Sequence, residues 1–535
     1  MAFAAAAARG MRASFTNAVF RSSIYRRMVL DGPVPNEIRQ VFPWHAPGDR
    51  TQAETILGQE FLFFGRRVPF GVMPWSMLPP GPKLARAMHG FAWLGDLKAN
   101  GSEEARARAR ALVMGWIAAN RRWSPVAWSP PALGQRLASW LASSDFLLAG
   151  ADGDERVRFL ESAGRQARHL ARVANTLSGT ADAFAVAGGE IAAALCLDAV
   201  PLSPALRRLE REIAVQILPD GGHVQRNPML HADIFRQLLD IRSALHNAGK
   251  SLPGVLAGAV ERMAPMLRAF RHGDGRLALF HGAKEGDRSL TDSLLAASKI
   301  TTSARVSAPE SGFERLTAGR TLVIVDVGPP PREGHASPLA FEMSNGRERL
   351  VVNCGAFGGD GESWRLALRS TPAHSTLTVQ DADALDVGWF GTLRMRVSSA
   401  RQETEGASWL DACHDGYRRR FGISHRRRLY LGETGADLRG EDRLRGRAGR
   451  RFLLRFHLHP DVRATLAGDR TSVTLRMATG VEWRFLALGG SLSLDESTYL
   501  GGSDQPRRCQ QIVVRGTTQK DETRVKWAFR NESTN

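Results

Sequence analysis

Two neighbouring stretches decide the fold prediction: GHASPLAFEMSNGRERLVVNCGAFGG at residues 334–359 and RSTPAHSTLTV at residues 369–379. The first contains two apolar, strand-like runs joined by Asn345-Gly346, a dipeptide that favours a tight hairpin turn because its backbone tolerates positive φ. His335 precedes the predicted hairpin, and Arg369 and His374 follow it. A rigid sheet that presents two imidazoles and a guanidinium is suited to an anionic substrate.

The strand pattern continues from about residue 302 to the end of the chain. Short β-branched or alternating runs are bounded by turn residues, for example TLVIVDVG at 321–328, RFLLRFHL at 451–458 and VKWAFR at 525–530. Runs of this length and spacing are typical of antiparallel all-β domains. We therefore predict an antiparallel β-sandwich over residues 303–535.

The preceding half is predicted to be helical. Apolar residues recur at spacings of three and four in the segments 103–122, 132–149, 155–177, 181–197, 204–218, 228–248 and 255–270. Short connections make successive helices antiparallel, which leaves a bundle, a solenoid or a closed α/α toroid open. The lack of a fixed-period repeat argues against a regular solenoid. Helices followed by strands predict two segregated domains of the α+β class.

Composition bounds the class of protein. With 535 residues, 43% hydrophobic and 24% charged, the chain is globular and too long for a single core. The net charge is +18, and only seven of the 72 basic residues are lysine. One explanation is a positive field that attracts a polyanion. The other is a general preference for arginine, with the charges spread over a solvated surface.

The cysteines and the N-terminus carry little information on location. Cys196, Cys354, Cys413 and Cys509 form no metal-ligand spacing, so we expect free thiols and no disulfide scaffold. Arg9 and Arg12 interrupt the apolar start, so no clear signal peptide is present. No run approaches the roughly 18 apolar residues of a membrane-spanning helix, and we expect none.

Two groups of residues leave alternatives open. Five tryptophans in the first helices either pack in a core or form platforms for sugar rings: Trp93, Trp116, Trp123, Trp128 and Trp140. The arginine runs 418–420 and 426–428 either face a polyanion or are solvated. No nucleic-acid-binding motif accompanies these runs, so we expect no nucleic-acid partner.

Four segments, in order along the chain, resemble the heparinase II/III family of polysaccharide lyases. They are Asn175 with Ala187-Gly188 downstream, DGGHVQRNPMLH at 220–231, Gly273-Asp274, and the block from His335 to His374. The resemblance implies an N-terminal α/α toroid (an incomplete helical barrel) over residues 51–302, after an extension at 1–50, and the β-sandwich at 303–535. Family members cleave uronate polysaccharides such as heparin, heparan sulfate or alginate by β-elimination, in a cleft between the two domains.

The resemblance also assigns catalytic roles. β-Elimination beside a carboxylate needs a group that stabilises the enolate, a base for the C5 proton, and an acid for the leaving oxygen. By position, Asn175 would neutralise the carboxylate and His335 would be the catalytic histidine of the β-domain. Many family members carry a tyrosine where this chain has Leu230, and leucine transfers no proton.

Three residues are considered as replacements for the missing tyrosine. His231 is adjacent to Leu230 and His223 lies on the same loop. Tyr417 lies beside an arginine run, and we expect this cationic setting to lower its pKa.

The remaining predictions concern binding. His223, Arg226, Arg369 and His374 would line the substrate site, because guanidinium groups pair with carboxylate or sulfate. Some relatives hold a structural zinc at positions that include His374, but Ser337 and Asn353 replace other ligands, so we expect no metal and no cofactor.

Two functions follow from this interpretation. The leading hypothesis is a lyase that cleaves an acidic, uronate-containing polysaccharide or oligosaccharide. The alternative is a catalytically impaired protein that retains the fold and binds a polyanion or carbohydrate. The resemblance points to the periplasm or cell envelope, and the missing signal peptide leaves the cytoplasm open.

Overall fold

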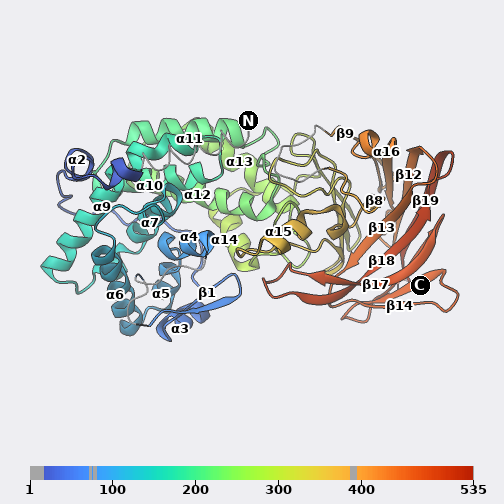
Figure 1. Cartoon of the computed structure of the whole chain (residues 1–535), viewed down its shortest axis with the longest axis horizontal. Coiled ribbons are helices and arrows are strands. Elements are labelled where there is room, and N and C mark those ends of the chain that lie inside the picture. The colour runs from blue at the N-terminus through green and yellow to red at the C-terminus, as the bar shows by residue number, and fades with distance from the viewer. Residues whose placement is uncertain (1–16, 72–74, 76–80, 386–394, 534–535) are drawn as a thin grey trace. The chain divides into compact units, whose positions relative to one another are not determined.

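The computed structural model describes residues 17–71, 75, 81–385 and 395–533. The chain forms two compact units (Figure 1). The helical unit comprises the residues up to 216 together with 234–260 and 296–298, and the β unit comprises 217–233, 261–295 and the residues from 299 on. Helices come first and strands later, as predicted. The domain boundaries at residues 50 and 302 stay a prediction, and the first 16 residues lie outside the described ranges.

The α-helices of the helical unit include α2 (Ser23–Tyr25), α3 (Arg50–Leu57), α4 (Pro82–Gly90), α5 (Leu94–Asn100), α6 (Glu103–Ala119), α7 (Pro130–Ala142), α8 (Ser144–Leu148), α9 (Gly153–Val173), α10 (Asp182–Leu197) and α11 (Leu202–Gln216). It also contains the π-helix η1 (Arg26–Leu30), the 3-10 helix η3 (Ala174–Leu177) and a hairpin of β1 (Glu60–Phe63) and β2 (Arg66–Pro69). Three further helices carry residues of both units: α12 (Pro228–Asn247), α13 (Gly254–Ala269) and α14 (Arg288–Ser298).

Local sequence explains the helix starts and contacts. Asp152 accepts from the backbone N–H of Glu155 while Glu155 reaches back, a capping box that begins α9. Helices α7 and α10 approach closely at Gly134 and Gly189, where a Cβ on Gly189 would lie 2.5 Å from the Gly134 Cα. The five tryptophans noted above are each at most 8% exposed, so they pack in the core of this unit.

The β unit contains two antiparallel sheets. The eight-stranded sheet has the order β14-β15-β16-β19-β12-β11-β10-β9, formed by β14 (Arg463–Leu466), β15 (Ser472–Arg476), β16 (Glu482–Leu488), β19 (Asp521–Asn531), β12 (Asp437–Gly446), β11 (Ile423–Leu431), β10 (Ala407–His414) and β9 (Val397–Thr404). The other has the order β17-β18-β13-β7-β6-β5-β4-β3, formed by β17 (Ser491–Tyr499), β18 (Arg507–Thr517), β13 (Arg451–Leu458), β7 (Glu348–Val352), β6 (Phe341–Asn345), β5 (Thr321–Asp326), β4 (Phe313–Ala318) and β3 (Ser307–Ala308). Strand β8 (Leu377–Val379) pairs with β13 as the ninth strand of this sheet.

One apolar core lies between the two sheets. Phe341 and Phe456 from the nine-stranded sheet pack with Phe485, Trp527 and Phe529 from the eight-stranded sheet. Successive side chains of each strand point to opposite faces of its sheet, and those on the two inner faces form this core. The predicted β-sandwich is therefore the architecture of the β unit.

The predicted hairpin forms between β6 and β7, with its turn displaced by one residue. Asn345 still pairs with Glu348, so Gly346 and Arg347 are the two turn residues. Gly346 adopts φ +56°, and Arg347 is not among the residues with positive φ. Helix α15 (Glu362–Arg369), η4 (Thr371–Ala373) and α16 (Arg418–Phe421) interrupt the strands.

A polar segment at residues 272–279, which precedes β3, covers the outer face of the nine-stranded sheet. His272 Nε2 lies 3.0 Å from a Glu342 carboxylate oxygen, and the Leu279 N–H donates to the same oxygen at 3.1 Å. Arg349 donates to Asp274 at 2.9 Å. These buried contacts fix the segment 272–279 on the sheet and so position the loop at residues 280–282 that follows.

Candidate active site of the β unit

Asp326, at the end of β5, is the centre of the site predicted around His335. Its side chain is fully buried, and its Oδ2 lies 3.1 Å from His281 Nε2 and accepts from the Ser337 hydroxyl at 3.1 Å. Burial by itself would raise the pKa of Asp326, but the charge of Arg226 and the nearby His281 lower it to about 2. The carboxylate is therefore ionised and joins three loops that are far apart in the sequence.

Arg226 pairs with Asp326 and links the backbone at residues 311–312 to the backbone at residue 329. Its guanidinium donates to Asp326 and to the carbonyls of Ser311, Gly312 and Pro329, and its side chain is only 5% exposed. This differs from the predicted substrate-binding role, because the N–H groups that would hold a ligand are used inside the protein. Arg226 is a structural residue.

Three histidines form a chain whose hydrogen-bond direction can be assigned from the partners. His374 Nδ1 lies 2.9 Å from the Ser370 carbonyl, which only accepts, so this nitrogen carries the proton. His374 Nε2 must then accept, at 3.0 Å, from Nδ1–H of His335. The backbone N–H of His335 donates to His281 Nδ1 at 3.3 Å, which leaves the proton of His281 on Nε2, towards Asp326.

This direction leaves the lone pair of neutral His335 on Nε2, and no donor among the described residues bonds it. A Cβ on Gly282 would lie 3.5 Å from that nitrogen and 3.4 Å from the amide nitrogen of Asn227. Gly282 adopts φ +92°, so the loop brings its backbone next to the imidazole without a side chain in between. His335 is thus held in the tautomer of a base, with Nε2 next to the gap that Gly282 leaves.

The electrostatic setting keeps the imidazoles neutral. Burial lowers the pKa of His335 well below its ordinary value, and His374, His281 and Arg369 lower it further. Burial likewise lowers the pKa of His374 to about 4. His374 is 1% exposed, so it orients His335 in place of the substrate contact expected from the sequence.

The two candidate replacements near Leu230 are inside the protein. His231 is fully buried beside Phe270, with Nε2 3.0 Å from the Met263 carbonyl. His223 is 1% exposed and its Nδ1 accepts from the backbone N–H of Gln225. Burial lowers their pKa values to about 4 and about 3. Both therefore differ from the surface acid or base that the sequence hypothesis requires.

The prediction for Tyr417 is also corrected. Its side chain is fully buried in the sandwich core, and its hydroxyl donates to the Leu377 carbonyl at 2.8 Å. Burial raises its pKa, so the expected lowering by nearby arginines is wrong. The phenol joins the residue that precedes α16 to strand β8, and it does not reach a ligand at the surface.

Two predicted residues keep accessible side chains. Asn175 lies in η3 of the helical unit and is exposed. Arg369, the last residue of α15, is half-buried and donates from Nε to the Gly334 carbonyl at 3.2 Å, next to His335.

Asn227 was not predicted as a site residue from the sequence. It caps α12 by accepting from the Met229 and Leu230 N–H groups.

The described residues contain no group of three His, Cys, Asp or Glu side chains arranged to hold a metal. Ser337 donates a hydrogen bond to Asp326, and Asn353 accepts from the Ser375 N–H at 3.0 Å, so both residues that replace zinc ligands make hydrogen bonds within the protein.

The sequence contained a signal for Asp326, since an acidic residue that ends an apolar strand requires a partner. No local signal pointed to His281.

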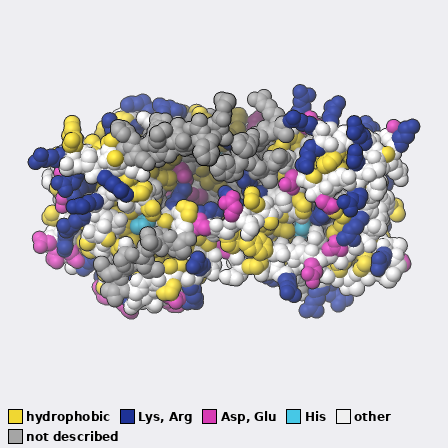
Figure 2. Space-filling model, in the orientation of Figure 1, with side chains coloured by type: hydrophobic (Ala, Val, Ile, Leu, Met, Phe, Trp, Pro, Cys, Tyr) yellow, Lys and Arg dark blue, Asp and Glu magenta, His cyan; other side chains and the backbone are white. Residues whose placement is uncertain are grey.

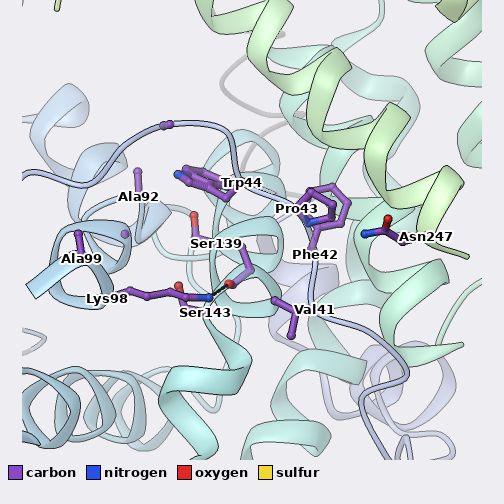
Figure 3. A pocket seen from close by; sticks show the side chains of 13 residues that line it. Val41, Phe42, Pro43, Trp44, Ala92, Lys98, Ala99, Ser139, Ser143 and Asn247 are labelled. Carbon is purple, nitrogen blue, oxygen red and sulfur yellow. Dashed lines mark hydrogen bonds between the residues drawn. The ribbon is translucent and has the colours of Figure 1, made fainter. Parts of the chain in front are cut away.

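The helical unit has a cavity of about 420 Å³ beneath residues 41–46 (Figure 3). Val41, Phe42 and Trp44 line it together with Ala99. Lys98 at its edge donates to the Ala142 carbonyl and pairs with Asp145 at 2.7 Å. The charged group of this cavity is thus already paired, and the arrangement offers less chemistry than the His335 site.

The surface shows how the basic residues are distributed. On the face in Figure 2, Lys and Arg side chains are scattered and do not gather in one patch. In the arginine runs, Arg427 is buried and pairs with Asp442, while Arg426 and Arg428 pair with Asp411. In the described part of the chain, no helix has the length and apolarity required to cross a bilayer.

Comparison with known proteins identifies relatives of the chain. Residues 300–528 match the family model "Heparinase II/III-like, C-terminal". FtsZ-localized protein C of Caulobacter vibrioides is 32% identical over 469 residues, which cover 82% of this chain and 80% of that protein.

Two solved structures have the same fold. A heparinase III structure superposes with a TM-score of 0.73 at 13% identity, covering 95% of this chain and 88% of that chain. A mutant of the heparan sulfate lyase HepC from Pedobacter heparinus gives a TM-score of 0.63 at 17% identity, covering 96% and 88%. These likenesses confirm an α/α toroid followed by an antiparallel β-sandwich. The chain belongs to the heparinase II/III family.

Proposed function

We propose that the protein is a lyase that cleaves an acidic, uronate-containing polysaccharide by β-elimination, with His335 as the base. The observation that supports this most is the free lone pair of His335 Nε2, which its hydrogen bond to His374 leaves next to Gly282. An imidazole held in one tautomer by a second residue is the arrangement that general-base catalysis uses.

The elimination that His335 would catalyse requires no co-reactant besides the substrate. Nε2 takes the proton from C5 of the uronate, the C5–H electrons form the C4–C5 double bond, and the C4–O bond to the leaving sugar breaks. The leaving oxygen then needs a proton. Protonated His335 can return it when C5–H and the leaving oxygen lie on the same face of the ring.

The electrostatics support binding of an acidic sugar at this imidazole. The low pKa of His335 makes it a weak base in the free protein. A substrate carboxylate nearby would raise that pKa and would pair with the guanidinium of Arg369. Among the described residues, this side chain donates only from Nε, to the Gly334 carbonyl. The role of Asn175 in neutralising the carboxylate stays a prediction.

A second candidate is a protein that binds acidic carbohydrate without turnover. Leu230 replaces the expected tyrosine, and the three tyrosines of the β unit lie elsewhere: Tyr417 in the core, Tyr430 on the outer face of the eight-stranded sheet, and Tyr499 bonded to Glu285. The relative from Caulobacter is named for localisation to FtsZ, and a corresponding location for this chain belongs with this candidate.

One experiment separates the candidates. The full chain is incubated with heparin, heparan sulfate, chondroitin sulfate and alginate, and ultraviolet absorbance of the unsaturated uronate is followed. We expect product with the wild type, none with His335→Ala, and wild-type rates with His246→Ala, an exposed histidine on α12. Binding without absorbance on every polymer would favour the second candidate. Undiminished turnover by His335→Ala would refute the assignment of the base.

A further inference from the structure

The outer face of the eight-stranded sheet contains a hollow of about 960 Å³. Cross-strand pairs place its central side chains in one row over five strands, in the order Leu486, Ala528, Arg439, Tyr430 and Trp409. Strand neighbours of this row, such as Phe485, Trp527 and Phe529, point the other way into the core. The row therefore faces away from the core, on β16, β19, β12, β11 and β10, of which β12 and β19 are labelled in Figure 1.

The two ends of the hollow are apolar and accessible. Trp409 is 48% exposed and lies against Tyr430, with ring centroids 4.5 Å apart. At the other end Leu488 is 72% exposed, next to Leu486 on the same strand face. Apolar side chains gathered in a concave surface of a soluble domain mark a binding site more often than scattered ones do.

The lining also carries an excess of positive charge. It contains six basic side chains, Arg428, Arg439, Arg443, Arg470, Lys526 and Arg530, against one acidic side chain, Glu441. Asp411, Asp437 and Glu441 pair with Arg428, Arg439 and Arg443.

The other three basic side chains are available to a ligand. Among the described residues, neither Arg470 nor Lys526 has an ion-pair partner, and Arg530 reaches Asp437 only at 3.9 Å. After these pairings the hollow stays positive, so its charge is complementary to an anionic ligand.

We propose that this hollow binds an acidic peptide segment of a partner protein, anchored by at least one aromatic or aliphatic side chain. Leucines and an aromatic pair form pockets for such an anchor, and the basic rim matches flanking carboxylates. An acidic sugar would stack on Trp409 but would gain nothing from Leu486 and Leu488. A bilayer surface would contact protruding side chains and not a hollow.

This binding site is separate from the candidate active site within the β unit. His335 is carried by the loop after β5, in the nine-stranded sheet, whereas the hollow lies on the outer face of the eight-stranded sheet. The inference does not rest on lyase activity, so loss of peptide binding and loss of turnover are expected to be independent.

The test uses fluorescence anisotropy of labelled synthetic peptides with the full chain. One set is rich in Asp and Glu and carries a single Trp, Phe or Leu; a second set has the same charge and Ser at the anchor position. We expect the anchored set to bind about tenfold more tightly, with affinity that falls as salt rises. Trp409→Ala and Lys526→Glu are each expected to weaken binding about tenfold.

Two matched variants serve as controls. Trp364→Ala removes a tryptophan that is 39% exposed on α15, and Lys520→Glu reverses an exposed charge before β19. Both are expected to bind like the wild type. No binding of any anchored peptide, equal binding of the two sets, or unchanged binding by Trp409→Ala would overturn the proposal. Tighter binding of heparin or of anionic vesicles than of any peptide, lost in the same two variants, would also overturn it.

Discussion

Replacing Asp326 by Asn tests the reasoning on the candidate site most directly. The substitution keeps the shape of the side chain and removes the charge that neutralises Arg226 in a fully buried position. The pKa of Asp326 is lowered from 3.8 to about 2, which corresponds to about 2 kcal/mol of stabilisation of the ionised form. Leaving the guanidinium buried and unpaired costs about 3–5 kcal/mol. We therefore expect Asp326→Asn to lower the free energy of unfolding by about 2–5 kcal/mol at neutral pH.

The assay is urea denaturation followed by circular dichroism, with a double-mutant cycle. Arg226→Met removes the charge that Asp326→Asn strands, so the double variant should regain part of the loss. Glu482→Gln breaks an exposed pair with Arg476 and is expected to change stability by less than about 1 kcal/mol. A loss below about 1 kcal/mol for Asp326→Asn, or strictly additive losses in the double variant, would refute the picture of a buried pair. The folded pKa is depressed, so this stabilisation is present above about pH 4 and is lost as pH falls through 2.

Three further outcomes are expected. Six buried histidines have pKa values lowered to about 3 or 4, so below about pH 6.5 the unfolded chain binds protons that the folded chain does not. Each of these histidines should therefore lower the free energy of unfolding by up to about 1.4 kcal/mol per pH unit. A melting temperature that stays constant from pH 7 to pH 5 would contradict this. Gly282→Ala fills the space in front of His335 Nε2 and should abolish turnover or carbohydrate binding. The control Gly480→Ala, at φ +88° with open space around it, carries similar backbone strain and should retain the turnover or binding. Equal activity of the two variants would argue against a ligand at this position. Cys196 and Cys354 are buried with pKa values raised to about 12, so both should resist a thiol reagent in the native protein and react after denaturation, and rapid native labelling of either would show that the core opens.

The sequence was informative where structure follows local pattern. Helical periodicity located α9 and α10 because a stripe of apolar residues reports burial of one face. Strand β12 contains no apolar run that would predict a strand, because its sequence, DLRGEDRLRG, is dominated by charge. In the structure Leu438, Asp442 and Leu444 face the core, and Asp442 is satisfied there by Arg427 and His425. A sequence this rich in charge forms a buried strand only because residues on a neighbouring strand pair with its inward-facing carboxylate.

By itself the sequence determined the order of helices and strands, the hairpin that follows His335, and the family. Tertiary structure alone decided which side chains meet in the candidate site. Arg226 and Asp326 are 100 positions apart, and His335 meets His281 and His374 across 54 and 39 positions. Local periodicity shows whether a residue faces inward but not which loops meet, because that depends on long-range strand pairing. The burial of Tyr417 and the free Nε2 of His335 therefore follow from the fold and not from their neighbours in the sequence.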